Sequence, residues 1–172
     1  MALTLEPLGP QHVPALAELV LDPDVLRYTR VPEPTPPGLA ETWIARYENG
    51  RAEGTREGFA IVDEDGEFLG LAVVPRIDRE ARTVELGYVV APAARGRGVA
   101  TETLRRLTEW TFDELDALRI ELLISVGNEA SIRVAERCGY VKEGVLRSMH
   151  FKQDLWEDTE IWSRLRTDPG PG

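Results

Sequence analysis

The chain has 172 residues, enough for one domain with a sizeable core, and its content of 42% hydrophobic and 29% charged residues is typical of a globular chain rather than a disordered one. Thirty acidic against twenty basic residues give a formal charge of −10, which argues against generic binding to nucleic-acid backbones. Apolar runs are too short to span a bilayer, so we expect neither a nucleic-acid nor a membrane partner.

The apolar periodicity of the first half of the chain predicts helices and an antiparallel group of strands. The predicted segments are a strand at 3–7, helices at 10–21 and 39–51, and strands at 58–62, 68–74 and 83–90. The Pro-rich stretch 31–38 should be irregular, because each Pro removes an amide donor and restricts the residue before it. Turn residues at 63–66 join two of these strands as a hairpin, which predicts an antiparallel arrangement.

The second half of the chain predicts a crossover between two parallel strands. Its predicted segments are a loop at 92–98, a helix at 99–115, a buried strand at 119–126, a helix at 129–138 ended by Gly139, and strands at 141–147 and 159–165 around a loop at 148–158. Strand, helix and strand in this order make one right-handed crossover. The expected fold class is therefore α/β (α+β): a mixed, mostly antiparallel central sheet with one parallel β-α-β crossover and helices on both faces. We expect a single domain at 1–166 and a disordered tail at 167–172.

Cysteine and histidine are too few for the common metal sites. The single cysteine, Cys138, excludes an internal disulfide and a cysteine-built metal centre, and His12 and His150 cannot complete a zinc site at the usual spacings. The first nine residues lack the basic stretch and apolar core of a secretory signal. We therefore expect a cytoplasmic protein without metal, in which Cys138 is a small buried core residue rather than a nucleophile.

An Arg- and Gly-rich loop lies between a predicted strand and a predicted helix. Gly96 and Gly98 lack side chains, so backbone amides at the positive end of the helix can converge on an anion, and Arg95 and Arg97 add charge beside them. This arrangement can hold a pyrophosphate. A plain tight turn is the alternative. A dinucleotide fingerprint fits less well because Thr101 occupies the place of a third Gly, and a P-loop is excluded because no GK[ST] follows.

Two blocks of sequence resemble one known superfamily. The residues RGRGVA at 95–100 resemble the [RQ]-x-x-G-x-[GA] acetyl-CoA signature of the GNAT superfamily of N-acetyltransferases. The block NEASIRVAERCGYVKEGVLR at 128–147 resembles the N-x-x-S…G-[FY]-x-x-E-G-x-x-R block of the RimJ/RimL-type ribosomal-protein N-terminal acetyltransferases. Asp158, after Trp156, is similar to the aspartate that closes the last loop of that subfamily. The resemblance covers residues 3–165.

The resemblance implies an enzyme that transfers an acetyl group from acetyl-CoA directly to a primary amine, with no acyl-enzyme. The backbone at Val89 and Val90, beside a bulge around Gly87, would pair with the pantetheine arm, and an amide near Val89 would polarise the thioester carbonyl. Asn128 would reach the pantetheine and Arg133 the nucleotide phosphates. The full set of expected acetyl-CoA contacts is Val89, Val90, Arg95, Gly96, Arg97, Gly98, Val99, Ala100, Thr101, Asn128, Ser131 and Arg133.

Two side chains are candidates for the catalytic chemistry. Glu85 is the carboxylate best placed to act as general base, through a water; the alternative is a strand residue that faces solvent or pairs with an Arg. Many relatives place a Tyr that acts as acid toward the thiolate seven residues after the Asn of the second block, where this chain has Ala135. Ser131 would then donate a hydrogen bond to the sulfur, and its alternative is an ordinary first-turn residue of a helix capped by Asn128.

The expected acceptor is the α-amine of a protein or peptide N-terminus. An α-amine has a pKa of about 8 and a lysine one of about 10.4, so the α-amine is unprotonated far more often at neutral pH and suits a site without the acidic Tyr. Tyr28, Trp43 and the Pro-rich loop fall where the family builds its acceptor wall. A small amine, such as an antibiotic or polyamine, and a non-catalytic acyl-CoA sensor are the alternatives. A homodimer is left open.

Overall fold

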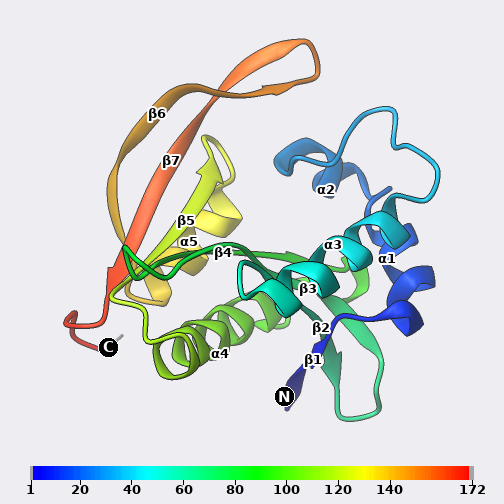
Figure 1. Cartoon of the computed structure of the whole chain (residues 1–172). Coiled ribbons are helices and arrows are strands. Elements are labelled where there is room, and N and C mark those ends of the chain that lie inside the picture. Colours follow the sequence, from blue (N-terminus) through cyan, green and yellow to red (C-terminus); the bar gives the residue numbers. More distant parts are fainter. Residues whose placement is uncertain (1, 171–172) are drawn as a thin grey trace.

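A mixed seven-stranded sheet forms the middle of the molecule in the computed structural model, which describes residues 2–170 (Figure 1). Its strand order is β1-β2-β3-β4-β5-β7-β6. The strands are β1 (Leu3–Pro7), β2 (Glu57–Asp63), β3 (Phe68–Asp78), β4 (Thr83–Val90), β5 (Arg119–Ser125), β6 (Val141–Lys152) and β7 (Leu155–Leu165). Within the described residues, β4 and β5 form the one parallel pair. The predicted fold class is confirmed.

Helices cover both faces of this sheet. They are η1 (Pro10–His12), α1 (Val13–Leu19), α2 (Pro23–Tyr28), α3 (Leu39–Glu53), η2 (Pro92–Ala94), α4 (Val99–Glu114) and α5 (Glu129–Arg137). Alternate residues of the strands point to opposite faces of the sheet and contribute to two separate hydrophobic cores. On one face Leu104 of α4 packs with Leu86 and Ile120, and on the other Leu16 of α1 packs with Ile44 of α3. None of the described helices has the length and apolar character needed to cross a membrane.

The segment between α1 and α3 contains a helix that the periodicity did not predict. Asp22 caps α2 by accepting a hydrogen bond from the Val25 amide, and Pro23 occupies the first turn. The predicted helix at 10–21 is also divided, into η1 and α1. Pro14, which has no amide to donate, stands near the start of α1, where a helix requires no such donor.

The predicted loop at 148–158 is wrong, because β6 and β7 continue through it as one long hairpin. Gln153 and Asp154 close the hairpin with φ of 49° and 62°, the two left-handed residues of a primed two-residue turn. Ser148 also has positive φ, and the register shifts between Leu146 and His150, which interrupts the alternation along β6. In the tail, the Asp168 carboxylate accepts the Leu165 amide, and residues 171–172 lie outside the described residues.

The tip of this hairpin arches over the end of β5 toward α2 (Figure 1). We call residues 148–157 the hairpin tip. Three contacts join it to α2 and the chain that follows. Arg27 Nη1 lies 2.7 Å from Glu157 Oε1, and Arg30 Nε donates to His150 Nε2 at 3.2 Å. The buried Lys152 ammonium donates to the Val31 carbonyl. The hairpin tip and α2 therefore form one continuous wall beside the open ends of β4 and β5.

Candidate active site

The parallel pair β4–β5 opens part of the way along its length. Pairing runs from Thr83 opposite Arg119 to Leu86 opposite Leu122 and stops there, although β4 continues to Val90 and β5 to Ser125. On its other side β4 stays paired with β3 up to Val90. Residues 87–90 therefore keep one free strand edge, which an extended ligand can join as an added strand.

The hydrogen-bond register between β3 and β4 determines which peptide groups of β4 face this free edge. The Ala91 amide donates to the Leu69 carbonyl at 2.8 Å, and the same register places Val89 opposite Leu71. Hydrogen-bonded pairs alternate along an antiparallel ladder, so the peptide groups of Val89 point toward β3. Those of Tyr88 and Val90 point toward the opening, where the Val90 carbonyl already accepts a hydrogen bond from Arg95 Nε. The amides near Val89 that can reach a ligand in the opening are therefore those of Tyr88 and Val90.

The predicted bulge lies on the neighbouring strand rather than at Gly87. Val73 pairs with Gly87 and Arg76 with Glu85, so two β3 residues, Val74 and Pro75, oppose the single β4 residue Leu86. Pro75 has no amide to donate to the ladder, and proline in a sheet is typical of such bulges. The irregularity thus sits at the level where β4 and β5 separate.

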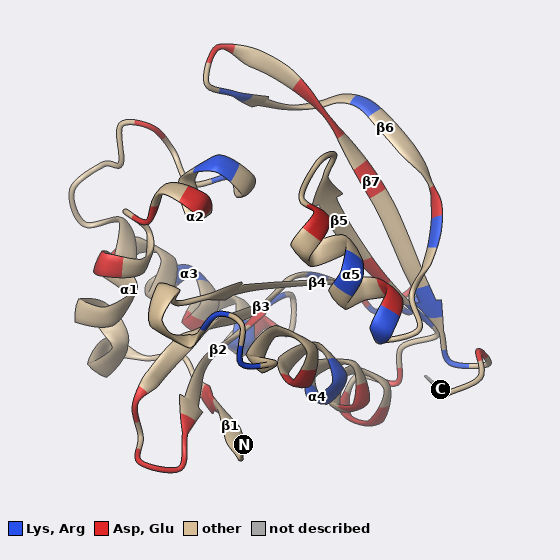
Figure 2. Ribbon diagram, turned by 180° about the vertical axis from the view of Figure 1, so that it is seen from behind, with Lys and Arg blue, Asp and Glu red and all other residues tan. Residues whose placement is uncertain are grey.

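The glycine-rich loop has the conformation that an anion site requires. Gly96 and Gly98 have φ of 73° and 81°, and Gly98 directly precedes the 16-residue α4. A Cβ at either position would meet no atom within 4 Å, so the space before the helix N-terminus is open. Figure 2 shows basic segments in this loop, whereas α4 and α5 each carry both basic and acidic segments. The loop at Gly96 and Gly98, together with the N-terminus of α4, therefore fits a pyrophosphate group.

Arg95, by contrast, is directed away from that space. Its Nη1 lies 2.9 Å from Asp24 Oδ2, its Nη2 contacts Asp22, and its Nε donates to the Val90 carbonyl at 3.1 Å. Burial tends to raise the pKa of Asp22, but the hydrogen bonds from Arg95 and the Val25 amide outweigh it and lower the pKa. Arg95 therefore joins the loop to α2, and its charge is neutralised there. The expectation that Arg95 adds charge beside the pyrophosphate stays a prediction.

The first turn of α5 approaches the opening from the other side. Asn128 Oδ1 accepts the Ser131 amide at 3.3 Å, which makes Asn128 the N-cap of α5. Burial raises the pKa of Tyr88 to about 12, against the opposing effect of the Ser131 side chain, and the buried Tyr88 hydroxyl forms no hydrogen bond within the described residues. Cys138 is buried in the core as predicted, and burial raises the pKa of its thiol. Arg133 pairs with Glu129 at 3.4 Å on the exposed side of α5.

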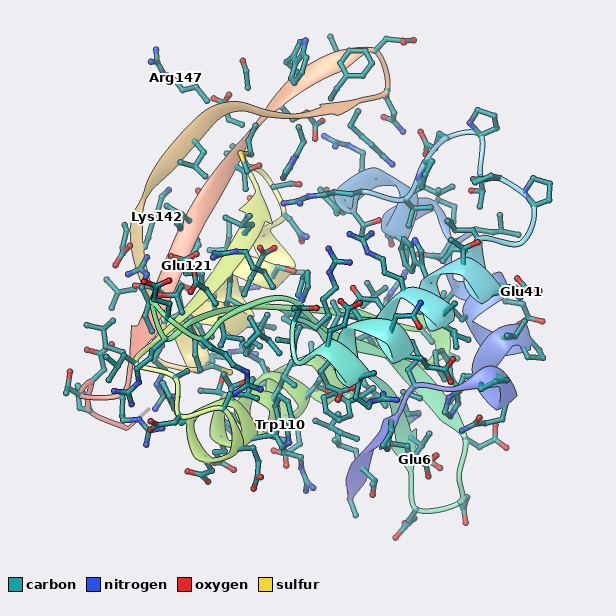
Figure 3. The ribbon with its side chains drawn as sticks, in the orientation of Figure 1. Glu6, Glu41, Trp110, Glu121, Lys142 and Arg147 are labelled. Atoms are coloured by element: carbon teal, nitrogen blue, oxygen red, sulfur yellow. The ribbon has the colours of Figure 1, made fainter. Side chains whose placement is uncertain are left out.

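Glu85 lies on the paired part of β4 and already has a basic neighbour. Its Oε2 is 3.9 Å from Arg76 Nε, and Arg76 Nη2 is 2.9 Å from Glu121 Oε2. Glu85 and Glu121 stand opposite each other in the β4–β5 register. Figure 3 shows Glu121 toward the start of β5, away from the hairpin tip. This arrangement matches the alternative of an Arg pair, and the general-base role stays a prediction.

Sequence reasoning missed the wall that faces the opening. The hairpin tip carries Trp156 and Phe151, which are 65% and 59% exposed and whose rings lie 5.4 Å apart. The Asp-Pro pair before α2 was a capping signal that could have revealed that helix. Arg147, which belongs to the second family block, points away from the arch (Figure 3).

An open strand edge beside a glycine-rich helix N-terminus defines a protein that binds an extended ligand with a phosphate group. A family model described as an acetyltransferase (GNAT) domain matches residues 2–141, so the chain belongs to the GNAT family and is an acyltransferase. Enzymes of this family use acetyl-CoA as a substrate.

Known proteins similar to this chain act on different amines. The putative ribosomal N-acetyltransferase YdaF of Bacillus subtilis is 26% identical, over 96% of this chain and 92% of the relative. The fold is similar to RimL, a ribosomal L7/L12 α-N-protein acetyltransferase solved with coenzyme A (TM-score 0.88, 21% identity, covering 96% and 94% of the two chains). It is also similar to a spermidine N-acetyltransferase from Vibrio cholerae with CoA and spermine (TM-score 0.85, 23% identity, covering 96% of each chain). The resemblance to the RimJ/RimL type is supported, and the substrate class is not settled by these relatives.

Proposed function

We propose that this enzyme transfers the acetyl group of acetyl-CoA directly to the α-amine of a protein or peptide N-terminus. The observation that carries the proposal is the free edge of β4, which begins after Leu86 and leads to the N-terminus of α4. The pantetheine arm adds to this edge as a short strand. The pyrophosphate then meets the amides between Gly96 and Ala100, where the backbone is bare and the helix dipole favours an anion.

The chemistry follows from groups along the same edge. The Tyr88 amide donates to the thioester oxygen, so negative charge that develops there is stabilised. The amine nitrogen attacks the carbonyl carbon, the C–S bond breaks with its electron pair on sulfur, and the amine proton leaves to water or, through water, to Glu85. Ser131 donates a hydrogen bond to the departing thiolate, because Ala135 offers no polar group. The Asn128 cap holds the first turn of α5 in place for this contact.

Carboxylates near the wall favour an α-amine over a polyamine. A polycation is best held by carboxylates that lack basic partners. Here Glu157 pairs with Arg27, Asp22 and Asp24 pair with Arg95, and the buried Glu160 pairs with Lys142. Each of these carboxylates has a basic partner within the protein, with Asp22 and Asp24 sharing Arg95. An acceptor with a single amine next to a neutral peptide chain suits such a surface better.

A panel of acceptors tests the proposal. Acetyl-CoA turnover is followed by release of free thiol, with N-terminal peptides of varied sequence compared with spermidine and an aminoglycoside. We expect kcat/KM to be at least about tenfold higher for a peptide, and mass spectrometry should place the acetyl group on its α-amine. Faster turnover of a small amine would reassign the substrate. Binding of acetyl-CoA without turnover of any amine would indicate a sensor. A cytoplasmic location and a homodimer also stay proposals.

Ser131→Ala tests the thiolate contact. Loss of one hydrogen bond to a charged atom is worth about 1.5 to 3 kcal/mol, or roughly ten- to a hundredfold in kcat, with little change in acetyl-CoA affinity. Ser163→Ala is the control, because that hydroxyl bonds Glu143 on a different strand, and its kcat should stay near wild type. Full activity in Ser131→Ala would show that another group serves the sulfur.

A further inference from the structure

The buried hydroxyl of Tyr88 has no hydrogen-bond partner within the described residues. Buried polar groups are nearly always paired, so such a hydroxyl requires an explanation. The neighbouring Tyr140 shows the usual solution, since its hydroxyl lies 2.7 Å from Thr108 Oγ1. Both tyrosines belong to the core between the sheet and the layer of α4 and α5. Among the described residues, the Tyr88 hydroxyl is one of four buried side-chain polar atoms without a partner; the others belong to Thr103, Thr159 and Arg164.

Tyr88 stands between the two groups that the proposed reaction requires. Its peptide faces the free edge of β4, and its side chain packs under α4 and α5 with Leu86. The Ser131 side chain is the hydroxyl that acts on the Tyr88 phenol, although the two groups do not form a hydrogen bond in the described structure. The rotation of a serine hydroxyl is free until a donor or acceptor fixes it.

We propose that Tyr88 is a positioning residue that donates a hydrogen bond to Ser131 Oγ and so directs the serine proton at the departing sulfur. This inference rests on the proposed role of Ser131. No proton needs to leave Tyr88: the phenol donates to the serine, the serine donates to the thiolate, and the sulfur is finally protonated by water. One strand residue then serves both ends of the breaking bond, with its amide at the carbonyl oxygen and its side chain behind the sulfur.

Tyr88→Phe tests this role, because it removes the hydroxyl and keeps the ring. We expect kcat to fall about three- to tenfold with KM for acetyl-CoA unchanged. Because the pKa of Tyr88 is raised to about 12, the phenol stays neutral, so the loss should be the same factor at pH 7 and pH 9. The Tm of the free enzyme should stay level or rise, since an unpaired hydroxyl is removed. Tyr140→Phe is the matched control: it breaks a formed hydrogen bond, so Tm should fall and kcat should not.

A double-mutant cycle separates the two proposals. If Tyr88 acts through Ser131, then Tyr88→Phe should have no further effect on kcat in the Ser131→Ala background. Losses that multiply in the double variant would overturn the positioning role. Unchanged kcat in Tyr88→Phe, together with a loss in Ser131→Ala, would overturn this inference and leave the proposed function standing. Full activity in Ser131→Ala would overturn this inference together with the proposed role of Ser131, whereas the choice of acceptor is decided by the panel of amines.

Discussion

The Arg95→Ala variant tests whether Arg95, a residue of the family signature, stabilises the fold or binds the ligand. In the structure Arg95 binds Asp22, Asp24 and the Val90 carbonyl, and so connects the glycine-rich loop with α2 and the end of β4. If these contacts persist in solution, the variant should be less stable without any ligand. If Arg95 instead binds phosphate, the free enzyme should be unaffected and only the affinity for CoA should fall.

The size of the effect follows from the burial of the partners. The Asp24 side chain is 69% exposed, so its ion pair should contribute under about 1 kcal/mol. The Asp22 side chain is only 12% exposed, and a hydrogen bond to such a charged group is worth about 1.5 to 3 kcal/mol. A total near 2 kcal/mol corresponds to a fall of roughly 4 to 8 °C in Tm for a chain of this size.

The effect should also depend on pH in a defined direction. The pKa of Asp22 in the folded protein is lower than its ordinary value of 3.8, so its contribution is complete above that value and is lost as the pH falls through the folded pKa. The difference in Tm between wild type and variant, measured by calorimetry, should therefore shrink from pH 7 to pH 3. Arg133→Ala, which removes an exposed pair with Glu129, should change Tm by less than about 2 °C. Equal Tm for Arg95→Ala and wild type at pH 7 would refute the reasoning.

Two further predictions concern the loop and the base. Gly98→Val and Gly66→Val place a branched residue at nearly the same φ, 81° and 82°, so both should lose about 1 to 2 kcal/mol of stability. In calorimetry, a hundredfold excess of acetyl-CoA over its Kd should raise Tm by roughly 5 to 10 °C in wild type and Gly66→Val but not in Gly98→Val. A normal rise of Tm in Gly98→Val would show that the pyrophosphate binds elsewhere. Glu85→Gln should reduce turnover more at pH 7 than at pH 9 if Glu85 is the base, whereas Glu121→Gln, which shares Arg76, should show no such difference. An equal loss of turnover at both pH values in Glu85→Gln would mean that Glu85 serves in the ion pair with Arg76 and not as the base.

The sequence predicts best the elements whose signals are local. The strand before the glycine-rich loop was predicted with both ends correct, and the helix after it ends at Glu114 rather than one residue later. Strict periodicity, the turn residues and the strand-helix-strand order all agree there. The hairpin was missed for an equally local reason. Its turn residues, Gln153 and Asp154, lack the Gly or Asn typical of left-handed positions, and Ser148 interrupts the alternation.

The details of the site depend instead on long-range contacts. Which peptide faces the opening is set by the register of β3 on β4, and a shift by one residue exchanges the two sides. The partners of Arg95 lie 71 and 73 residues away in the chain, so no local pattern indicates that this arginine turns from the phosphate site. The relation between Tyr88 and Ser131 likewise exists only after α5 has packed on the sheet.

The contacts of Arg95 also connect the loop expected to bind acetyl-CoA with the wall proposed to face the acceptor. The loop expected to hold the pyrophosphate contacts Asp22, which caps α2, and α2 holds the hairpin tip through Arg27 and Glu157. A change in the loop therefore reaches the acceptor wall through a short helix and two ion pairs. Arg95→Ala should then raise KM for the acceptor even at saturating acetyl-CoA, and Arg27→Ala should raise it without weakening acetyl-CoA. Equal acceptor KM in Arg95→Ala and wild type would mean that the two sides act independently.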